Sequence, residues 1–157
     1  MKPVLVLALG NPLVGDDAIG CVVAERVAAD PEVAARADIN CGGTDLFRRA
    51  PELAGRNRII IVDAALTDAP DLQVRAVPHP PPAGDRRSHA HALDPVGAVN
   101  LLRSLDAAIA AADTWWVLIE VPRVALHPGL SAGAAAHLPE ALAAVRRLVL
   151  EVAVPPS

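Results

Sequence analysis

Two kinds of hydrophobic pattern alternate at the start of the chain. Residues 4–9 form a short run without any polar side chain, which is typical of a strand buried on both faces of a parallel sheet. Residues 19–29 carry their apolar side chains at helical spacing, with Glu25 and Arg26 on the opposite face and Pro31 just beyond. The chain therefore opens with a strand followed by a helix.

The same alternation continues to the C-terminus. Asp94 followed by Pro95 is a strong helix start, because an acidic N-cap and a proline in the first turn both suit a helix N-terminus. Strands that alternate with helices predict one three-layer α/β domain over residues 1–157, built around a mostly parallel, twisted sheet. We expect the later elements as follows: strands at 38–41, 58–62, 72–77 and 115–121, a short helix at most within 46–53, and helices at 96–112 and 131–154, the last kinked at Pro139.

Composition and charge exclude several classes of protein. Hydrophobic residues make up 53% of the 157, enough for one sizeable core. The net charge is −4 and the arginines are single or paired, so there is no basic stripe and we expect no nucleic-acid partner. No stretch of 18 apolar residues predicts a membrane span. No long exposed apolar helix face stands out, so we expect a monomer.

The opening segment indicates the cytoplasm, and the cysteines are expected to be reduced. The opening apolar run is six residues long and meets Gly10-Asn11-Pro12 instead of a signal-peptide cleavage site. Cys21 and Cys41 lack the C-x-x-C spacing and any secretory context, so we expect both to be reduced thiols in the core.

Polar residues gather after the predicted strands. Asp16 and Asp17 follow the first strand, Asp63 ends the strand at 58–62, and His91 lies in the loop before the Asp94-capped helix. Ligands of open α/β sheets collect at the carboxyl ends of the strands. Two carboxylates and an imidazole there would suit a borderline divalent metal with open positions, although a single aspartate at a turn more often caps the turn.

The glycines of the first loop do not form a nucleotide-binding motif. They stand at positions 10, 15 and 20, whereas the dinucleotide fingerprint needs G-x-G-x-x-G, and Asp16-Asp17 replaces the Lys-Ser/Thr of a P-loop. A pair of carboxylates would also repel a phosphate. We therefore expect no organic cofactor.

The pattern Gly10-Asn11-x-Leu13-x-x-Asp16-Asp17-x-x-Gly20 resembles the opening motif of the hydrogenase maturation endopeptidases, the nickel-dependent proteases that trim the large subunit of [NiFe] hydrogenases. Nearly the whole chain agrees in the same order. The further matching segments are Gly42-Gly43-Thr44, Ile59-Ile60-Ile61-Val62-Asp63-Ala64, His91-Ala92-Leu93 and His127-Pro128-Gly129-Leu130-Ser131. Two departures, Ala18 for a glycine and Asn40 where an aspartate is common, affect no ligand but leave the subfamily open.

The resemblance implies both an activity and a ligand set. The activity is hydrolysis of one peptide bond near the C-terminus of a nickel-loaded large-subunit precursor, with the nickel supplied by that precursor. Asp17, Asp63 and His91 take the positions of the family's metal ligands, with Asp16 and His89 as the alternatives one and two residues away. The Gly42-Gly43-Thr44 turn either receives the precursor's extended tail or merely ends a strand.

Two other functions fit the same residues. One is a nickel-binding protein of this fold without peptidase activity, and the other is a small hydrolase with its own zinc ion. Cys21 lies at helical spacing among valines and no Ser/His/Asp arrangement is present in the motif, so a covalent mechanism is disfavoured and water is the expected nucleophile. A carboxylate or the metal would activate it.

Overall fold

The computed structural model describes residues 1–43, 45–81, 94–122 and 129–152. Their strands form one five-stranded sheet in the order β2-β1-β3-β5-β4. All neighbouring pairs are parallel except β4 with β5, which is antiparallel. The strands are β1 (Val4–Ala8), β2 (Ala37–Cys41), β3 (Arg58–Thr67), β4 (Val74–Pro78) and β5 (Asp113–Pro122).

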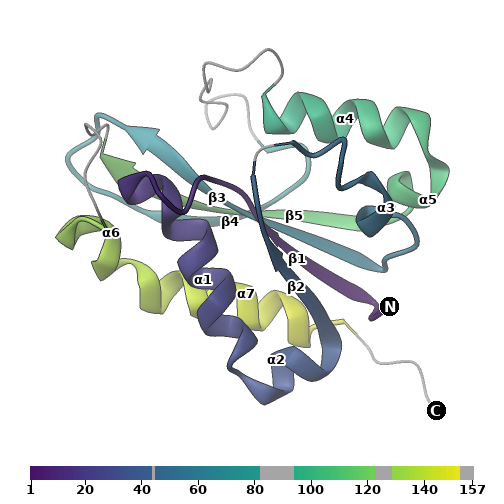
Figure 1. The fold of residues 1–157 in the computed structure, drawn as a ribbon, viewed down its shortest axis with the longest axis horizontal. Coiled ribbons are helices and arrows are strands. Elements are labelled where there is room, and N and C mark those ends of the chain that lie inside the picture. The colour runs from purple at the N-terminus through teal and green to yellow at the C-terminus, as the bar shows by residue number, and fades with distance from the viewer. Residues whose placement is uncertain (44, 82–93, 123–128, 153–157) are drawn as a thin grey trace.

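Helices cover both faces of this sheet, which confirms the three-layer α/β architecture (Figure 1). One face is covered by α1 (Ile19–Ala28), α2 (Pro31–Arg36), α6 (Ala132–Ala136) and α7 (Leu138–Leu150). The other is covered by α3 (Ala50–Leu53), α4 (Pro95–Leu105) and α5 (Ala107–Ala110). A single 3-10 turn, η1 (Gly15–Ala18), joins β1 to α1.

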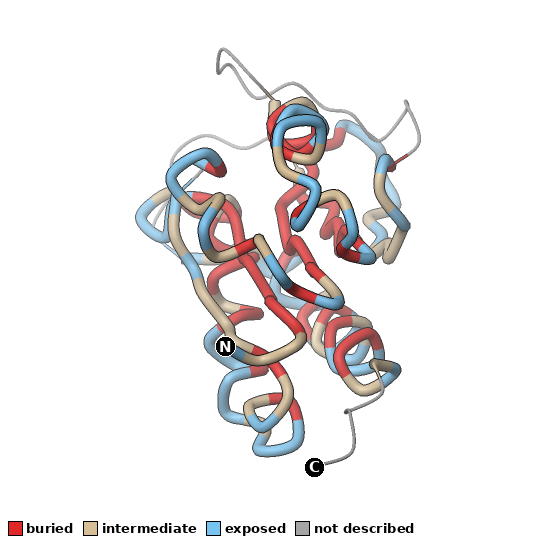
Figure 2. The backbone as a smooth tube through the Cα atoms, turned by 90° about the vertical axis from the view of Figure 1, so that its right-hand side faces the viewer, coloured by how far each residue is buried: buried red, intermediate tan, exposed pale blue. Residues whose placement is uncertain are grey.

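The alternation of side chains along β1 explains why this strand lacks polar residues. Val4, Val6 and Ala8 belong to the core on the α1 face, while the leucines at 5, 7 and 9 belong to the core on the α4 face. Both cores need apolar side chains because successive residues of a strand point to opposite faces. Figure 2 shows the buried residues running along the central strands, with exposed residues on the outer turns of the helices.

Strand β3 is longer than the sequence predicted. It continues for five residues beyond Val62, because β5 pairs with it along its whole length, from Arg58 opposite Asp113 to Thr67 opposite Pro122. The prediction that Asp63 ends the strand was therefore wrong. Pairing with β1 stops at Val62, however, so Asp63 is the first residue of β3 beyond the end of β1.

Capping residues explain where the observed helices differ from those predicted from the sequence. The helix predicted at 96–112 breaks at Asp106, whose carboxylate accepts a hydrogen bond from the Ala108 amide and starts α5. The predicted kink at Pro139 is instead a break at His137 between α6 and α7, and Pro139 lies in the first turn of α7. Helix α2, which the sequence analysis did not predict, begins at an Asp30 N-cap.

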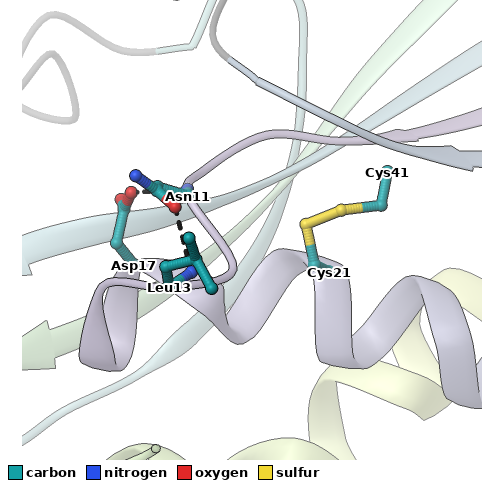
Figure 3. Close-up of a disulfide and its surroundings, with 5 residues drawn as sticks. All are labelled: Asn11, Leu13, Asp17, Cys21 and Cys41. Atoms are coloured by element: carbon teal, nitrogen blue, oxygen red, sulfur yellow. Dashed lines mark hydrogen bonds between the residues drawn. A yellow bond between two sulfur atoms is a disulfide. The ribbon is translucent and has the colours of Figure 1, made fainter. Parts of the chain in front are cut away.

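The expectation about the two cysteines was also wrong. Cys21 in α1 and Cys41 at the end of β2 form a disulfide, so they are not the reduced thiols that the sequence predicted (Figure 3). Their Cα atoms are 5.2 Å apart although 20 positions separate them in the chain. No local spacing signals this pair, because the packing of α1 against β2 brings the two residues together.

Candidate active site

The loop between β1 and α1 is a tightly hydrogen-bonded turn that holds Asp17. The Asn11 amide donates to Asp17 Oδ2 at 2.7 Å, and Asn11 Oδ1 in turn accepts from the Leu13 amide at 2.9 Å (Figure 3). The Asp17 amide donates to the carbonyl of Val14 at 3.0 Å. Asp17 is half-buried, and Leu13 beside it is 88% exposed. The motif therefore builds a rigid loop that presents one carboxylate at its surface.

Two glycines of the motif let this loop approach the sheet. Gly10 has φ +113°, and a Cβ there would lie 2.1 Å from the carbonyl oxygen of Asp17. A Cβ on Gly20 would lie 2.8 Å from the carbonyl oxygen of Leu9 and 2.9 Å from that of Val62. Any side chain at either position would push the loop or α1 away from the strand ends.

Asp16 has a different role from its neighbour. Asp16 is 3% exposed, and its carboxylate accepts two hydrogen bonds from Ser131, one from the amide at 2.6 Å and one from the hydroxyl at 2.7 Å. Ser131 is also the N-cap of α6. Asp16 thus fastens the loop after β1 to the start of α6, and both of its oxygens are engaged by Ser131.

Asp63 lies beside this loop. The Leu9 amide donates to the carbonyl of Val62 at 2.8 Å, which places the chain leaving β1 next to the residue that precedes Asp63. Asp63 is 6% exposed and alternates with Ile61 and Ala65 onto the α4 face of the sheet. Helix α4 on that face begins at Asp94, whose side chain accepts from the Gly97 amide as predicted.

Sequence reasoning missed an ion pair on this face, between Glu120 and Arg75. Glu120 is 9% exposed and stands on β5 opposite Ala65 of β3. Its carboxylate accepts from the Gln73 amide and pairs with Arg75 Nη2 on β4, each at 3.2 Å. The signal available in the sequence was Glu120 itself, the single charged residue inside the apolar run 117–121.

The structure describes some of the remaining predicted site residues and leaves the others outside the described ranges. Gly42 and Gly43 follow β2, and the Gly42 amide donates to the carbonyl of Ala8 at 3.3 Å, so this turn adjoins the end of β1. His89, His91 and Thr44 lie outside the described residues. Within the described part of the chain, no group of three His, Cys, Asp or Glu side chains could hold a metal ion, and no helix is long and apolar enough to cross a membrane.

Comparison with known proteins shows which class of protein this fold is similar to. No protein-family model and no curated protein sequence matches the chain. Several solved structures, however, are similar to it. The [NiFe] hydrogenase maturation protease HybD from Thermococcus kodakarensis is similar over 95% of this chain and 99% of its own, with 28% identity and a TM-score of 0.75. The hydrogenase maturating endopeptidase HybD from E. coli is 22% identical over 96% of this chain and 93% of its own, with a TM-score of 0.71.

A third similar structure is the [NiFe] hydrogenase maturation protease HycI from Thermococcus kodakarensis KOD1, at 15% identity and a TM-score of 0.72 over 96% of this chain and 94% of its own. The resemblance inferred from the sequence motifs is therefore confirmed. In fold and in motif, this chain is similar to hydrogenase maturation proteases, which are endopeptidases.

Proposed function

We propose that this protein removes a short C-terminal peptide from the nickel-loaded precursor of a [NiFe] hydrogenase large subunit. The observation that carries the proposal is the loop from Gly10 to Gly20. It holds the Asp17 carboxylate at the end of β1, next to the strand that bears Asp63, within the fold of the maturation proteases. The exposed Leu13 gives the partner an apolar contact beside that carboxylate.

In this proposal Asp17, Asp63 and His91 coordinate the nickel that the precursor carries. Carboxylate oxygens and an imidazole nitrogen suit a borderline divalent ion. The hydrogen bonds of Asp16 support the choice of Asp17, because both Asp16 oxygens are engaged by Ser131, whereas among the described residues Asp17 uses Oδ2 alone, on the Asn11 amide. His91 remains the proposed imidazole ligand, with His89 as the alternative.

The hydrolysis proceeds without a covalent enzyme intermediate. Both cysteines of the chain are in the disulfide, which leaves no thiolate to attack a carbonyl carbon. Water is the nucleophile, and the half-buried Asp17 carboxylate is a suitable proton acceptor for it. The turn at Gly42-Gly43, beside the end of β1, receives the extended tail of the precursor. We retain the cytoplasm as the compartment and a monomer as the working state.

The test is mass spectrometry of the precursor after incubation with this protein, with nickel loaded in one sample and absent in the other. We expect loss of a C-terminal peptide in the loaded sample alone. Asp17→Asn, Asp63→Asn and His91→Ala should each abolish the cleavage. Asp71→Asn and His137→Ala, outside the site, serve as matched controls and should cleave normally.

The alternatives predict other results. A non-catalytic nickel-binding protein would leave a competent precursor intact in both samples, while the three site variants would lose only nickel affinity. A zinc hydrolase would contain stoichiometric zinc after purification, which elemental analysis measures directly. Cleavage of a nickel-free precursor would contradict the proposed dependence on substrate metal.

A further inference from the structure

The guanidinium group of Arg49 has one edge without a hydrogen-bond partner. Arg49 Nη1 pairs with Glu52 Oε1 at 3.1 Å, but Nε and Nη2 are buried and have no partner among the described residues. Buried polar atoms are almost always satisfied in native proteins, because leaving one unpaired costs its hydration without return. An unpaired donor edge of this kind is open to a hydrogen-bond acceptor from outside the described residues.

The unpaired atoms are the two that bind carboxylates as a fork. In this same protein, Arg58 uses Nε and Nη2 together on Asp113 Oδ2, at 2.8 and 2.6 Å. Glu52 cannot serve the Arg49 fork, because its Oε1 faces Arg49 Nη1 and its Oε2 accepts from Asn40 Nδ2 at 2.6 Å. A guanidinium fork matches a planar pair of oxygens.

The fork lies at the predicted substrate turn. A Cβ built on Gly42 would be 3.6 Å from Arg49 Nη2 and 3.9 Å from its Cζ, so the main chain at Gly42 lies against this edge. Because β2, β1 and β3 are neighbours in the sheet and strands are about 5 Å apart, the turn lies about 10 Å across the sheet edge from the strand of Asp63. An extended peptide covers that distance in about three residues.

We propose that the Nε and Nη2 edge of Arg49 binds a carboxylate of the precursor's C-terminal segment, about three residues from the bond that is cut. This inference rests on the proposed function. The carboxylate replaces the main-chain cover of the Gly42-Gly43 turn and fixes the register of the tail across the strand ends. Its source is either an acidic side chain or the terminal carboxylate of the tail.

The first experiment needs no hydrogenase. Nitrogen-15 NMR of the Arg49 Nε–Hε group is recorded while N-acetylglycine is added, with N-acetylglycinamide as the probe that lacks a carboxylate. We expect N-acetylglycine alone to shift the Arg49 signal. The neighbouring Arg48, whose side chain is 87% exposed and paired with Asp45, is the internal control and should not follow it. No shift at Arg49, or an equal shift with the amide, overturns the proposal.

The second experiment measures precursor cleavage by Arg49→Lys, Arg49→Gln and the control Arg48→Gln. Lysine keeps a positive charge for Glu52 but has no fork, so a purely structural ion pair would survive in Arg49→Lys. Both Arg49 variants should raise KM about 10- to 100-fold with little change in kcat, because the lost contact binds substrate and transition state alike. A wild-type KM in Arg49→Lys contradicts the proposal, while the Arg48 variant should behave as the wild type.

Two altered precursors identify the source of the carboxylate. In one, the acidic residues near the scissile bond are changed to amides, and in the other the tail is extended beyond its natural terminus. Whichever change raises KM with the wild-type enzyme should have no further effect with Arg49→Lys. If neither does, the ligand of Arg49 is not a carboxylate and the proposal fails. If N-acetylglycine shifts Arg49 but no precursor is cleaved, the proposed function fails while the carboxylate site stands.

Discussion

Asp16 and Ser131, 115 positions apart in the chain, are joined by two hydrogen bonds that use both carboxylate oxygens. Through this contact the loop after β1 is fastened to the N-terminus of α6. The carboxylate of the adjacent Asp17 accepts a hydrogen bond from the Asn11 amide, and this residue is half-buried. Two consecutive aspartates thus have separate roles, one structural and one at the proposed site.

This division predicts opposite effects of the same substitution. Asp16→Asn should lower the free energy of unfolding by about 1–3 kcal/mol, because a buried charge-assisted hydrogen bond is lost. Asp17→Asn should change it by less than about 0.5 kcal/mol and should abolish precursor cleavage. Urea unfolding of both variants, with Ser131→Ala to complete a double-mutant cycle on Asp16, measures the difference. A stable, inactive Asp16→Asn variant would exchange the two assignments.

Reduction of the disulfide should destabilise the protein. Closing a chain segment with a sequence separation of 20 removes conformational entropy from the unfolded state, worth about 3 kcal/mol in the chain-entropy model. We expect dithiothreitol to lower the urea midpoint of the wild type and to leave the Cys21→Ser, Cys41→Ser double variant unchanged. Alkylation of both thiols in the native, unreduced protein, seen as added mass, would instead support reduced cysteines.

A side chain at Gly20 should separate α1 from the strand ends. The new Cβ of Gly20→Ala would lie within 3 Å of two main-chain carbonyl oxygens, those of Leu9 and Val62. We expect a loss of about 1–3 kcal/mol of stability from overpacking, together with reduced cleavage. Gly133→Ala in α6 is the matched control, since its Cβ would lie 3.4 Å from the Leu72 side chain and 3.9 Å from Ser131 Oγ, both ordinary contact distances, and alanine favours a helix. Equal stability of the two variants would contradict this explanation.

The ion pair between Asp38 and Arg56 should make stability depend on acid pH. The hydrogen bond from the Arg56 guanidinium is the main cause that lowers the pKa of Asp38 from its ordinary value of 3.8, outweighing the opposing effect of burial. Because the folded-state pKa lies below that of the unfolded chain, the pair stabilises the fold above the ordinary value. That contribution is lost as the pH falls through the folded-state pKa.

Asp38→Asn should therefore be less stable than the wild type by about 1–3 kcal/mol at pH 7, where it leaves the buried Arg56 without its charge partner. The difference between the two proteins should shrink as the pH falls below 3.8. Urea unfolding at several pH values between 7 and 2.5 measures it. A gap that stays constant over this range would exclude the ion pair as the cause.

The amino-acid sequence by itself determined the layered fold and the order of its elements. The apolar run at 4–9 predicted β1 because a central parallel strand needs hydrophobic side chains on both faces, and the caps at Asp94 and Ser131 lie where helices begin. The motif from Gly10 to Gly20 indicated the class of enzyme, since its residues build one local turn whose hydrogen bonds are mostly short in sequence separation.

Only the tertiary structure decided the features that depend on partners distant in the chain. Strand β3 extends past Asp63 because β5 pairs with it, and Asp16 is structural because α6 places Ser131 against it. The Cys21–Cys41 disulfide and the open edge of Arg49 likewise arise where separate elements meet. Periodicity and capping report local conformation, whereas these contacts are fixed by how the elements pack.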